Sequence, residues 1–321
     1  MGEFELIRHY FAAAPCAQAG EGVALGIGDD CALLDIPAGE QLAVSTDSLV
    51  AGVHFPEAAD PFLLGQRALA VSASDLAAMG ATPIGFTLAL TLPAARADWL
   101  QAFARGLNLM AQDCGLRLIG GDTTRGPLSL TLTVFGRVPR GQALTRGGAR
   151  VGELLCVGGT LGDGAGALPL VLGQLQAEPA VAEALLARYW SPQPQLALGQ
   201  ALRGKATAAL DISDGLLADC GHIAAASGVA LQIELARLPL SAPLKALHGL
   251  EGARRCALSG GDDYRLTFTL PATELPALQT AGWSVAVVGQ VVAGQGVQLL
   301  DEQGQVLPVP LGGYQHFEGS A

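Results

Sequence analysis

The sequence predicts an α/β fold, with α+β character, divided into two domains. Two observations lead to this fold class: strand-like apolar runs alternate with helical periodicity in both halves, and 321 residues exceed the usual length of one domain. Residues 139–152 (PRGQALTRGGARVG) are rich in Gly and Arg and have no apolar periodicity. We therefore predict an N-terminal domain over residues 1–148 and a C-terminal domain over residues 149–321.

Charge and composition restrict the partners and the location of the protein. The formal net charge is −11, whereas nucleic acids and anionic membranes need a basic face, so neither is expected as a partner. The long uncharged stretch 277–300 is broken by Gly, Gln and Ser and alternates as buried strands do. The N-terminus lacks a signal-peptide core, and the six scattered cysteines have no metal-ligand spacing. We expect a cytoplasmic protein with buried, reduced thiols.

The stretch LAVSTDSLVAGVHF, residues 42–55, is the first candidate site. Its alternating apolar start predicts a strand that ends in Ser45, Thr46 and Asp47. Two hydroxyls followed by a carboxylate suit a hard cation such as Mg²⁺, which prefers oxygen ligands. A polar turn alone would also account for this stretch.

The rest of the N-terminal half alternates helices and strands. Asp60 and Pro61 are typical of a helix start, and Asp75 interrupts the apolar stretch AVSASDLAAMG, where an unpaired charge is costly. Asp75 is therefore a further site candidate. The predicted helices cover residues 3–13, 62–79 and 98–114, and the predicted strands cover residues 31–36, 84–92, 116–119 and 128–138.

Acidic side chains also stand at three later boundaries of predicted strands. The stretch GGDTT, residues 120–124, follows a strand, and its glycines allow close backbone approach to a phosphate or metal; a glycine turn is the alternative. In DISDG, residues 211–215, two acids three positions apart can face a shared cation. The stretch SGGDDY, residues 259–264, precedes another strand. Further strands are expected at residues 154–157, 206–210, 229–235 and 265–270, and helices within 181–202 and 216–226.

These acids would repel one another if the fold gathered them. Two carboxylates about 4 Å apart cost about 4 kcal/mol at an effective dielectric constant of about 20, and two or three such pairs rival a typical total stability of about 5–15 kcal/mol. A site formed by these acids therefore requires cations, and we expect it to bind several Mg²⁺ ions together with a polyphosphate. Residues 199–206 nearly spell a P-loop, but Ala206 has no hydroxyl for the metal. The acids concerned are Asp29, Asp30, Asp47, Asp75, Asp122, Asp211 and Asp214.

Six motifs, in order along the chain, resemble those of the thiamine-monophosphate kinase family. They are GIGDDCALL (residues 26–34), STDSLVAGVHF (45–55), SDLAAMGA (74–81), IGGDTT (119–124), DISDGL (211–216) and SGGDDY (259–264). This family belongs to the aminoimidazole ribonucleotide synthetase superfamily. The resemblance implies phosphorylation of thiamine phosphate by ATP, which is bound without a P-loop. It also implies an N-terminal domain that forms a homodimer through its sheet and a C-terminal α/β domain that completes the active site.

The resemblance also implies roles for the residues that match the family motifs. The implied Mg²⁺ ligands are Asp30, Ser45, Thr46, Asp47, Asp75, Asp122, Asp211 and Asp214. The implied nucleotide contacts are Gly121, Asp122, Arg146 and Ser213. The implied contacts to thiamine phosphate are His54, Asp262, Phe317 and Tyr314. The sequence departs from the family at DDYR, residues 262–265, where relatives usually have Glu-Asp-Tyr-Glu, and at Tyr314, where Trp is common.

A mechanism follows from the charge of the implied substrates. Thiamine phosphate is a phosphate monoester with a second pKa near about 6, so it is largely ionised at pH 7 and needs no general base. We expect in-line transfer of the γ-phosphoryl group of ATP, assisted by Mg²⁺, to give thiamine diphosphate without a phosphoenzyme. Another enzyme of the superfamily, or a nucleotide-binding assembly protein without turnover, are the alternatives.

Overall fold

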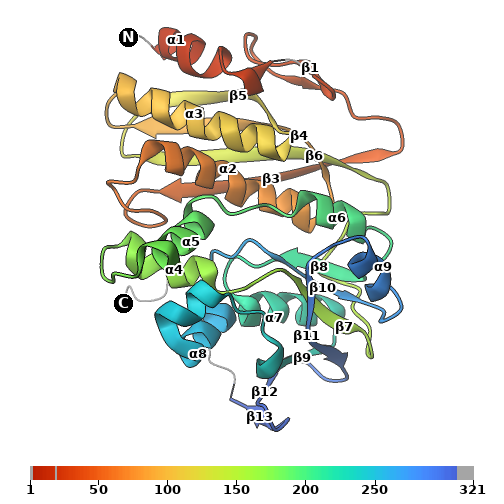
Figure 1. Cartoon of the computed structure of the whole chain (residues 1–321). Helices are drawn as coiled ribbons and strands as arrows, with labels where there is room; N and C mark the ends of the chain where they lie inside the picture. The colour runs from red at the N-terminus through yellow and green to blue at the C-terminus, as the bar shows by residue number, and fades with distance from the viewer. Residues whose placement is uncertain (1–2, 19, 309–321) are drawn as a thin grey trace, which may run out of the picture. The chain divides into compact units, whose positions relative to one another are not determined.

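The computed structural model of the chain describes residues 3–18 and 20–308, so Tyr314 and Phe317 lie outside the described part (Figure 1). The described residues form two compact units. The first comprises the chain up to Leu76 together with Ala81–Ala143, and the second comprises Ala77–Gly80 together with the chain from Leu144 onward. The mixed α/β class predicted from the sequence is confirmed.

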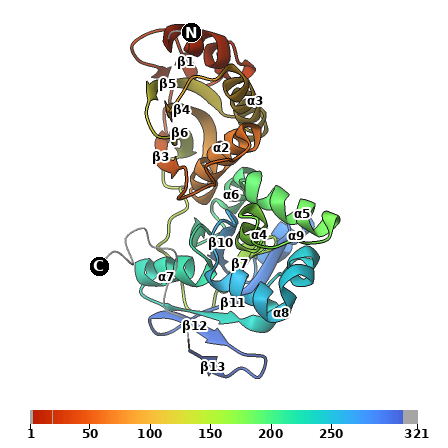
Figure 2. The ribbon, with the colours of Figure 1, turned by 90° about the vertical axis from the view of Figure 1, so that its left-hand side faces the viewer.

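The first unit is built on a four-stranded sheet with the strand order β3-β6-β4-β5. β6 is antiparallel to both β3 and β4, whereas β4 and β5 are parallel. Figure 2 shows α2 and α3 on the same side of this sheet. The elements are α1 (Glu3–Leu6), the π-helix η1 (Ile7–Ala12), the 3₁₀ helix η2 (Pro15–Ala17), β1 (Val23–Leu25), β2 (Leu33–Leu34), β3 (Glu40–Val50), α2 (Pro61–Ala78), β4 (Thr82–Leu92), α3 (Ala97–Cys114), β5 (Arg117–Arg125) and β6 (Ser129–Pro139).

Local sequence signals explain the ends of the two covering helices. Asp60 Oδ1 accepts hydrogen bonds from the backbone N–H groups of Phe62 (2.8 Å) and Leu63 (3.1 Å), so it caps the first turn of α2. Gly115 ends α3 in the left-handed conformation, with a φ of 67° that favours glycine. Both predictions of helix ends are confirmed.

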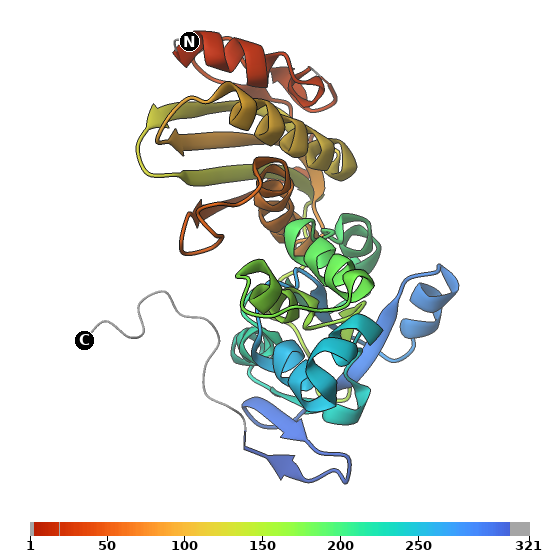
Figure 3. The same cartoon turned by 60° about the vertical axis from the view of Figure 1, so that its left-hand side comes forward.

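The second unit contains a seven-stranded sheet with the order β13-β12-β9-β11-β7-β10-β8, in which only the β9–β12 pair is parallel among the described strands. In Figure 3 the helices α4, α5 and α8 lie side by side, and they contact one another. The elements are β7 (Leu154–Gly158), α4 (Asp163–Val171), α5 (Pro179–Trp190), α6 (Leu196–Leu202), β8 (Ala208–Asp211), α7 (Leu216–Ser227), β9 (Ala230–Glu234), the 3₁₀ helix η3 (Leu235–Arg237), α8 (Ala242–Ser259), β10 (Leu266–Leu270), α9 (Leu275–Thr280), β11 (Val285–Val292), β12 (Gly296–Leu300) and β13 (Val306–Leu307).

Alternation along the interior strand β7 divides the core of this unit into two layers. Leu155 and Val157 are buried in a cluster with side chains of α7, whereas Cys156 is buried in a second cluster with side chains of α6 and α9. Successive side chains of a strand point to opposite faces, so helices cover both faces of the sheet. This arrangement leaves the loops at the strand ends free to carry polar groups.

Two general predictions about composition are tested by the structure. All six cysteines are free thiols, and four of them are buried, but Cys31 is exposed and Cys256 is half-buried. The prediction of buried cysteines is therefore wrong for Cys31, which lies in an exposed turn. Among the described residues, no helix is long and apolar enough to cross a membrane.

Candidate active site

The segment with Ser45, Thr46 and Asp47 lies inside a strand and not at its end. β3 continues to Val50 and pairs residue by residue with β6, from Glu40 opposite Pro139 to Val50 opposite Ser129. The prediction of a strand end is wrong because cross-strand partners accommodate the polar side chains within the sheet. Consecutive residues of a strand face opposite sides, so Thr46 points away from the face of Ser45 and Asp47.

Ser45 and Asp47 face the covering helices, where they meet α2. The Ser45 hydroxyl donates a short hydrogen bond to Oδ2 of Asp75. Burial, followed by the charge of Asp75, raises the pKa of Asp47 to about 6, against the opposing effect of a hydrogen bond from Ser72. The structure thus places two carboxylates and a hydroxyl together in a partly buried position, which is the oxygen donor set that suits Mg²⁺.

The opposite face of the sheet carries Thr46 and Asp122. Thr46 Oγ1 shares a 2.9 Å hydrogen bond with Thr133 Oγ1 across the strands. Residues that pair directly across two strands share a face. Asp122 pairs with Ala89, and Ala89 pairs with Thr131, which lies on the same face of β6 as Thr133. The sheet therefore separates the side chains of Thr46 and Asp122 from the pair Asp47 and Asp75.

The GGDTT stretch also lies within a strand, since β5 runs to Arg125 beside β4. The predicted strand end at residue 119 is therefore wrong. A Cβ atom at Gly121, where φ is 150°, would lie only 2.0 Å from the backbone oxygen of Leu88. Glycine is required here because β5 approaches β4 closely at the position just before Asp122.

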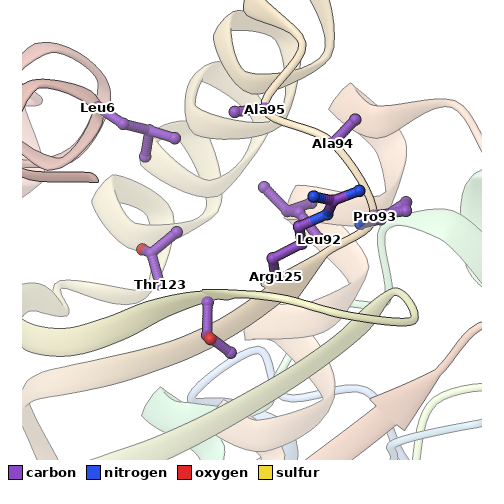
Figure 4. A pocket seen from close by; sticks show the side chains of 8 residues that line it. Leu6, Leu92, Pro93, Ala94, Ala95, Thr123 and Arg125 are labelled. Atoms are coloured by element: carbon purple, nitrogen blue, oxygen red, sulfur yellow. The ribbon is translucent and has the colours of Figure 1, made fainter. Parts of the chain in front are cut away.

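A cavity of about 490 Å³ lies beside the end of β5 in the first unit (Figure 4). Thr123 and Arg125 line it, and both are paired with apolar residues of β4, Leu90 and Leu92, that face the covering helices. The side chains of Thr123 and Arg125 are therefore on the other side of the sheet from the Asp122 side chain. Its remaining lining residues are Leu6, Leu92, Pro93, Ala94, Ala95 and Thr124.

Two predicted site residues of the first unit lie in turns. Nδ1 of His54 accepts a hydrogen bond of 3.0 Å from the Val50 backbone N–H, which orients the imidazole against the end of β3. Asp30 is exposed, and its backbone N–H donates to Oδ1 of Asp29 at 2.9 Å. This hydrogen bond links the two neighbouring acids of the GIGDDCALL motif.

In the second unit, β8 ends at Asp211 and leads through Ser213 and Asp214 to α7. The Asp214 backbone N–H donates to Oδ2 of Asp219 at 3.1 Å. Burial raises the pKa of Asp219 to about 7, and the charges of Asp214 and Asp211 act in the same direction. Sequence reasoning missed Asp219, although an acid in the apolar stretch LLADCG is the same signal that identified Asp75.

The loop with Asp262 packs against this acidic loop. The Asp262 N–H donates to the Ser213 carbonyl oxygen (3.0 Å), and the Tyr264 N–H donates to the Ile212 carbonyl oxygen (2.8 Å). The Tyr264 hydroxyl donates to Asp262 Oδ1 at 3.0 Å. Elsewhere in this unit, Arg146 is exposed, and its carbonyl oxygen accepts a hydrogen bond of 3.3 Å from Ser227.

The structure therefore brings predicted site residues together in two groups, one within each unit. One contains Ser45, Asp47 and Asp75, and the other contains the loop 211–214 with Asp262. Within residues 3–18 and 20–308, no three His, Cys, Asp or Glu side chains are arranged so that they could hold a metal ion. The complete set of eight Mg²⁺ ligands stays a prediction.

The fold and these groups define the class of protein. Residues 28–138 match the family model described as AIR synthase related protein, N-terminal domain, and residues 150–302 match the corresponding C-terminal domain. The chain is thus a two-domain AIR synthase related protein.

Full-length relatives specify the family within that class. Thiamine-monophosphate kinase of Escherichia coli K12 is 46% identical over 321 residues, which cover 98% of both chains. The crystal structure of thiamine-monophosphate kinase from Stenotrophomonas maltophilia K279a superimposes with a TM-score of 0.86 at 46% identity, covering 96% of this chain and 98% of that one. A ThiL complexed with AMPPCP and TMP gives a TM-score of 0.79 at 30% identity, over 88% and 89% of the two chains. The chain belongs to the thiamine-monophosphate kinase family.

Proposed function

We propose that this protein transfers the γ-phosphoryl group of ATP to thiamine phosphate, producing ADP and thiamine diphosphate. The observation that carries the proposal is the 46% identity to a thiamine-monophosphate kinase over 98% of both chains. The related ThiL complex with AMPPCP, an ATP analogue, and TMP supports the same pair of substrates. This reaction is the last step in the formation of thiamine diphosphate.

Magnesium fits the donor set of the first unit. Asp47 and Asp75 repel each other when both are ionised, and this repulsion adds to burial, the main cause of the raised pKa of Asp47. A divalent cation would reverse the sign of that interaction and stabilise both carboxylates. We propose several ions and not one, because Thr46 and Asp122 lie on the face of the sheet opposite Asp47 and Asp75. The proposed ligands are Asp30, Ser45, Thr46, Asp47, Asp75, Asp122, Asp211 and Asp214.

The residues of this chain bind and align two anionic substrates. In this proposal the nucleotide is held by Gly121, Asp122, Arg146 and Ser213. Thiamine phosphate is contacted by His54, Asp262, Phe317 and Tyr314, the last two of which lie outside the described residues. When bound, Mg²⁺ neutralises phosphate charge and reduces repulsion between the substrates.

No residue of this chain is assigned as a general base. The attacking phosphate oxygen of thiamine phosphate is already ionised at pH 7, because the second pKa of a phosphate monoester is about 6. This oxygen attacks the γ-phosphorus of ATP. The bond between the γ-phosphorus and the oxygen that bridges the β- and γ-phosphates breaks, and ADP leaves with the electron pair of that bond. The role of the side chains is to hold the acceptor in line with this bond.

The exposed face of the four-stranded sheet supports the proposal of a homodimer. Leu42 (46% exposed), Val44 (54%) and Val50 (37%) all lie on β3 and face the side opposite Ser45 and Asp47. A row of exposed apolar side chains on an edge strand favours contact with another chain. A second copy pairing through the same face would bury these residues in a two-fold symmetric interface.

We also propose a cytoplasmic location. The six cysteines are free thiols in the structure, which suits a reducing compartment. ATP, the proposed phosphoryl donor, is available there.

The proposed activity is tested by ADP release with different acceptors. The purified protein is incubated with ATP and Mg²⁺ and with thiamine phosphate, thiamine or an aminoimidazole precursor, and Asp47→Asn serves as the control. Release that depends on thiamine phosphate and is lost in Asp47→Asn is the expected result. Turnover only with another acceptor would overturn the assignment of thiamine phosphate as the substrate. No turnover with any of the three acceptors would favour a binding protein.

A further inference from the structure

Three loops of the second unit meet through direct contacts between their backbones. The loop 259–265 pairs with the acidic loop 211–215 through the hydrogen bonds of Asp262 and Tyr264 described above. A Cβ atom at Gly261 would lie 2.2 Å from the Ser213 carbonyl oxygen, and one at Gly164 would lie 2.2 Å from the Asp262 carbonyl oxygen. Glycine at both positions permits this close approach of the three loops.

Asp263 joins the third loop to this assembly. Its carboxylate accepts the Gly162 N–H through both oxygens, at 2.9 Å to Oδ1 and 2.7 Å to Oδ2, and the Gly164 N–H at 3.4 Å. These amides form the N-terminus of α4, which favours negative charge. Asp263 is only 7% exposed, so a side chain from a distant part of the sequence caps this helix within the core.

The residues on either side of Asp263 have unusual backbone conformations. Asp262 has a φ of 68° and Tyr264 a φ of 49°, and these are the only non-glycine residues with positive φ in the described part of the chain. Such conformations persist only where the surroundings fix them. The capping carboxylate between them, together with the two hydrogen bonds to the acidic loop, supplies that constraint.

Asp263 itself is shielded from a substrate. Its side chain is only 7% exposed, and its two oxygens accept the Gly162 and Gly164 amides, whereas Asp262 is half-buried. The cleft that both carboxylates line has a volume of about 10 Å³ and holds at most about one water molecule. Asp263 therefore acts through its neighbours and not by contact with a ligand.

We propose that Asp263 is a positioning residue that fixes the Asp262–Tyr264 turn for recognition of the thiamine phosphate acceptor. The inference rests on the proposed function, because Asp262 is a proposed acceptor contact. By clamping the turn to the N-terminus of α4, Asp263 sets the direction of the Asp262 carboxylate. The hydrogen bond from the Tyr264 hydroxyl completes that orientation.

The test compares Asp263→Asn with Asp163→Asn in the full-length protein. Asp163 is a matched control, because it is similarly buried at the same end of α4 but accepts hydrogen bonds from Thr160 (2.9 Å) and Ser241 (2.5 Å). Both variants are expected to lower the melting temperature. Only Asp263→Asn is expected to raise the KM for thiamine phosphate, by about 10-fold, while the KM for ATP changes less than about 2-fold, since a misplaced binding group costs mainly the substrate it contacts.

An unchanged KM for thiamine phosphate in Asp263→Asn, or an equal rise in Asp163→Asn, would overturn the inference. If Asp263→Asn does not fold, Asp263→Glu keeps the charge and both oxygens on a longer side chain, and the same selective rise in KM is expected. Wild-type protein without activity toward thiamine phosphate would instead count against the proposed function. Direct calorimetric titration of thiamine phosphate into wild type and variants separates these outcomes.

Discussion

At the residue scale, Asp47 and Asp75 oppose stability in the absence of metal. Because burial and a neighbouring charge raise the pKa of Asp47 to about 6, its ionised form is disfavoured in the folded state. We expect Asp47→Asn to stabilise the metal-free protein at pH 8 by about 1 kcal/mol and to abolish turnover. Urea unfolding in EDTA measures this, with exposed Asp113→Asn as a control that should change neither property. A destabilised Asp47→Asn protein would contradict the account.

The pH dependence of stability provides a second test at this scale. Burial raises the pKa values of Asp219 and Asp263 to about 7. An unfolded aspartate has a pKa of about 3.9, so between about pH 4 and pH 7 the folded state binds more protons than the unfolded state. The free energy of unfolding of the metal-free protein should therefore fall as the pH rises through this window and then level off.

Asp219→Asn should reduce the slope of this pH dependence, because it removes one of the three carboxyl groups with raised pKa values, the third being Asp47. Chemical unfolding at about half-unit pH intervals in EDTA measures the effect. A free energy of unfolding that rises steadily between pH 4 and pH 7 would show that these carboxyl groups ionise freely in the folded protein.

At the element scale, the cap of α2 makes a separate contribution to stability. Asp60 accepts hydrogen bonds from the Phe62 and Leu63 N–H groups, which have no partners within the helix. Asp60→Ala should lower the free energy of unfolding by about 1 kcal/mol, while Asp60→Asn, which caps equally well, should retain most of it. Equal stability of Asp60→Ala and wild type in urea would contradict this role.

Local signals of this kind made most element positions predictable from the sequence. The cap at Asp60, the glycine after α3 and the apolar run of β7 depend on neighbouring residues alone. β3 and β5 were predicted too short because Ser45, Asp47 and Gly121 have local preferences for turns. The partners of these strands lie far away in the sequence: Thr133 pairs with Thr46, and Leu88 approaches Gly121. Tertiary pairing overrides the local preference in these cases.

The same distinction applies to the candidate site. Asp75 was predictable because a charged side chain in an apolar helix is costly unless it is paired or coordinated. The same reasoning would have identified Asp219. Asp263 stands beside a predicted contact, but its role depends on amides at Gly162 and Gly164 about a hundred positions away. No sequence spacing indicates such a contact. The assignment of Thr46 and Ser45 to opposite faces likewise required the register of the sheet.

At the scale of the whole molecule, the exposed face of β3 predicts the oligomeric state. Val44→Lys places a charge in the proposed interface and should convert the proposed dimer into a monomer, because a buried unpaired charge is costly. Leu109→Lys is the matched control, since Leu109 is 41% exposed on α3, compared with 54% for Val44 on the sheet. Sedimentation velocity distinguishes the two species. A monomeric wild-type protein, or a Val44→Lys protein that remains dimeric, would contradict the proposed interface.

The central claim, direct phosphoryl transfer to thiamine phosphate, is tested by following the γ-phosphate of ATP. Wild-type protein is incubated with γ-³²P-labelled ATP, Mg²⁺ and thiamine phosphate, and the quenched reaction is separated by chromatography. The account predicts that the label enters thiamine diphosphate in equal amount to the ADP formed, with none bound to the protein. Label recovered as inorganic phosphate, or attached to the polypeptide, would contradict direct transfer.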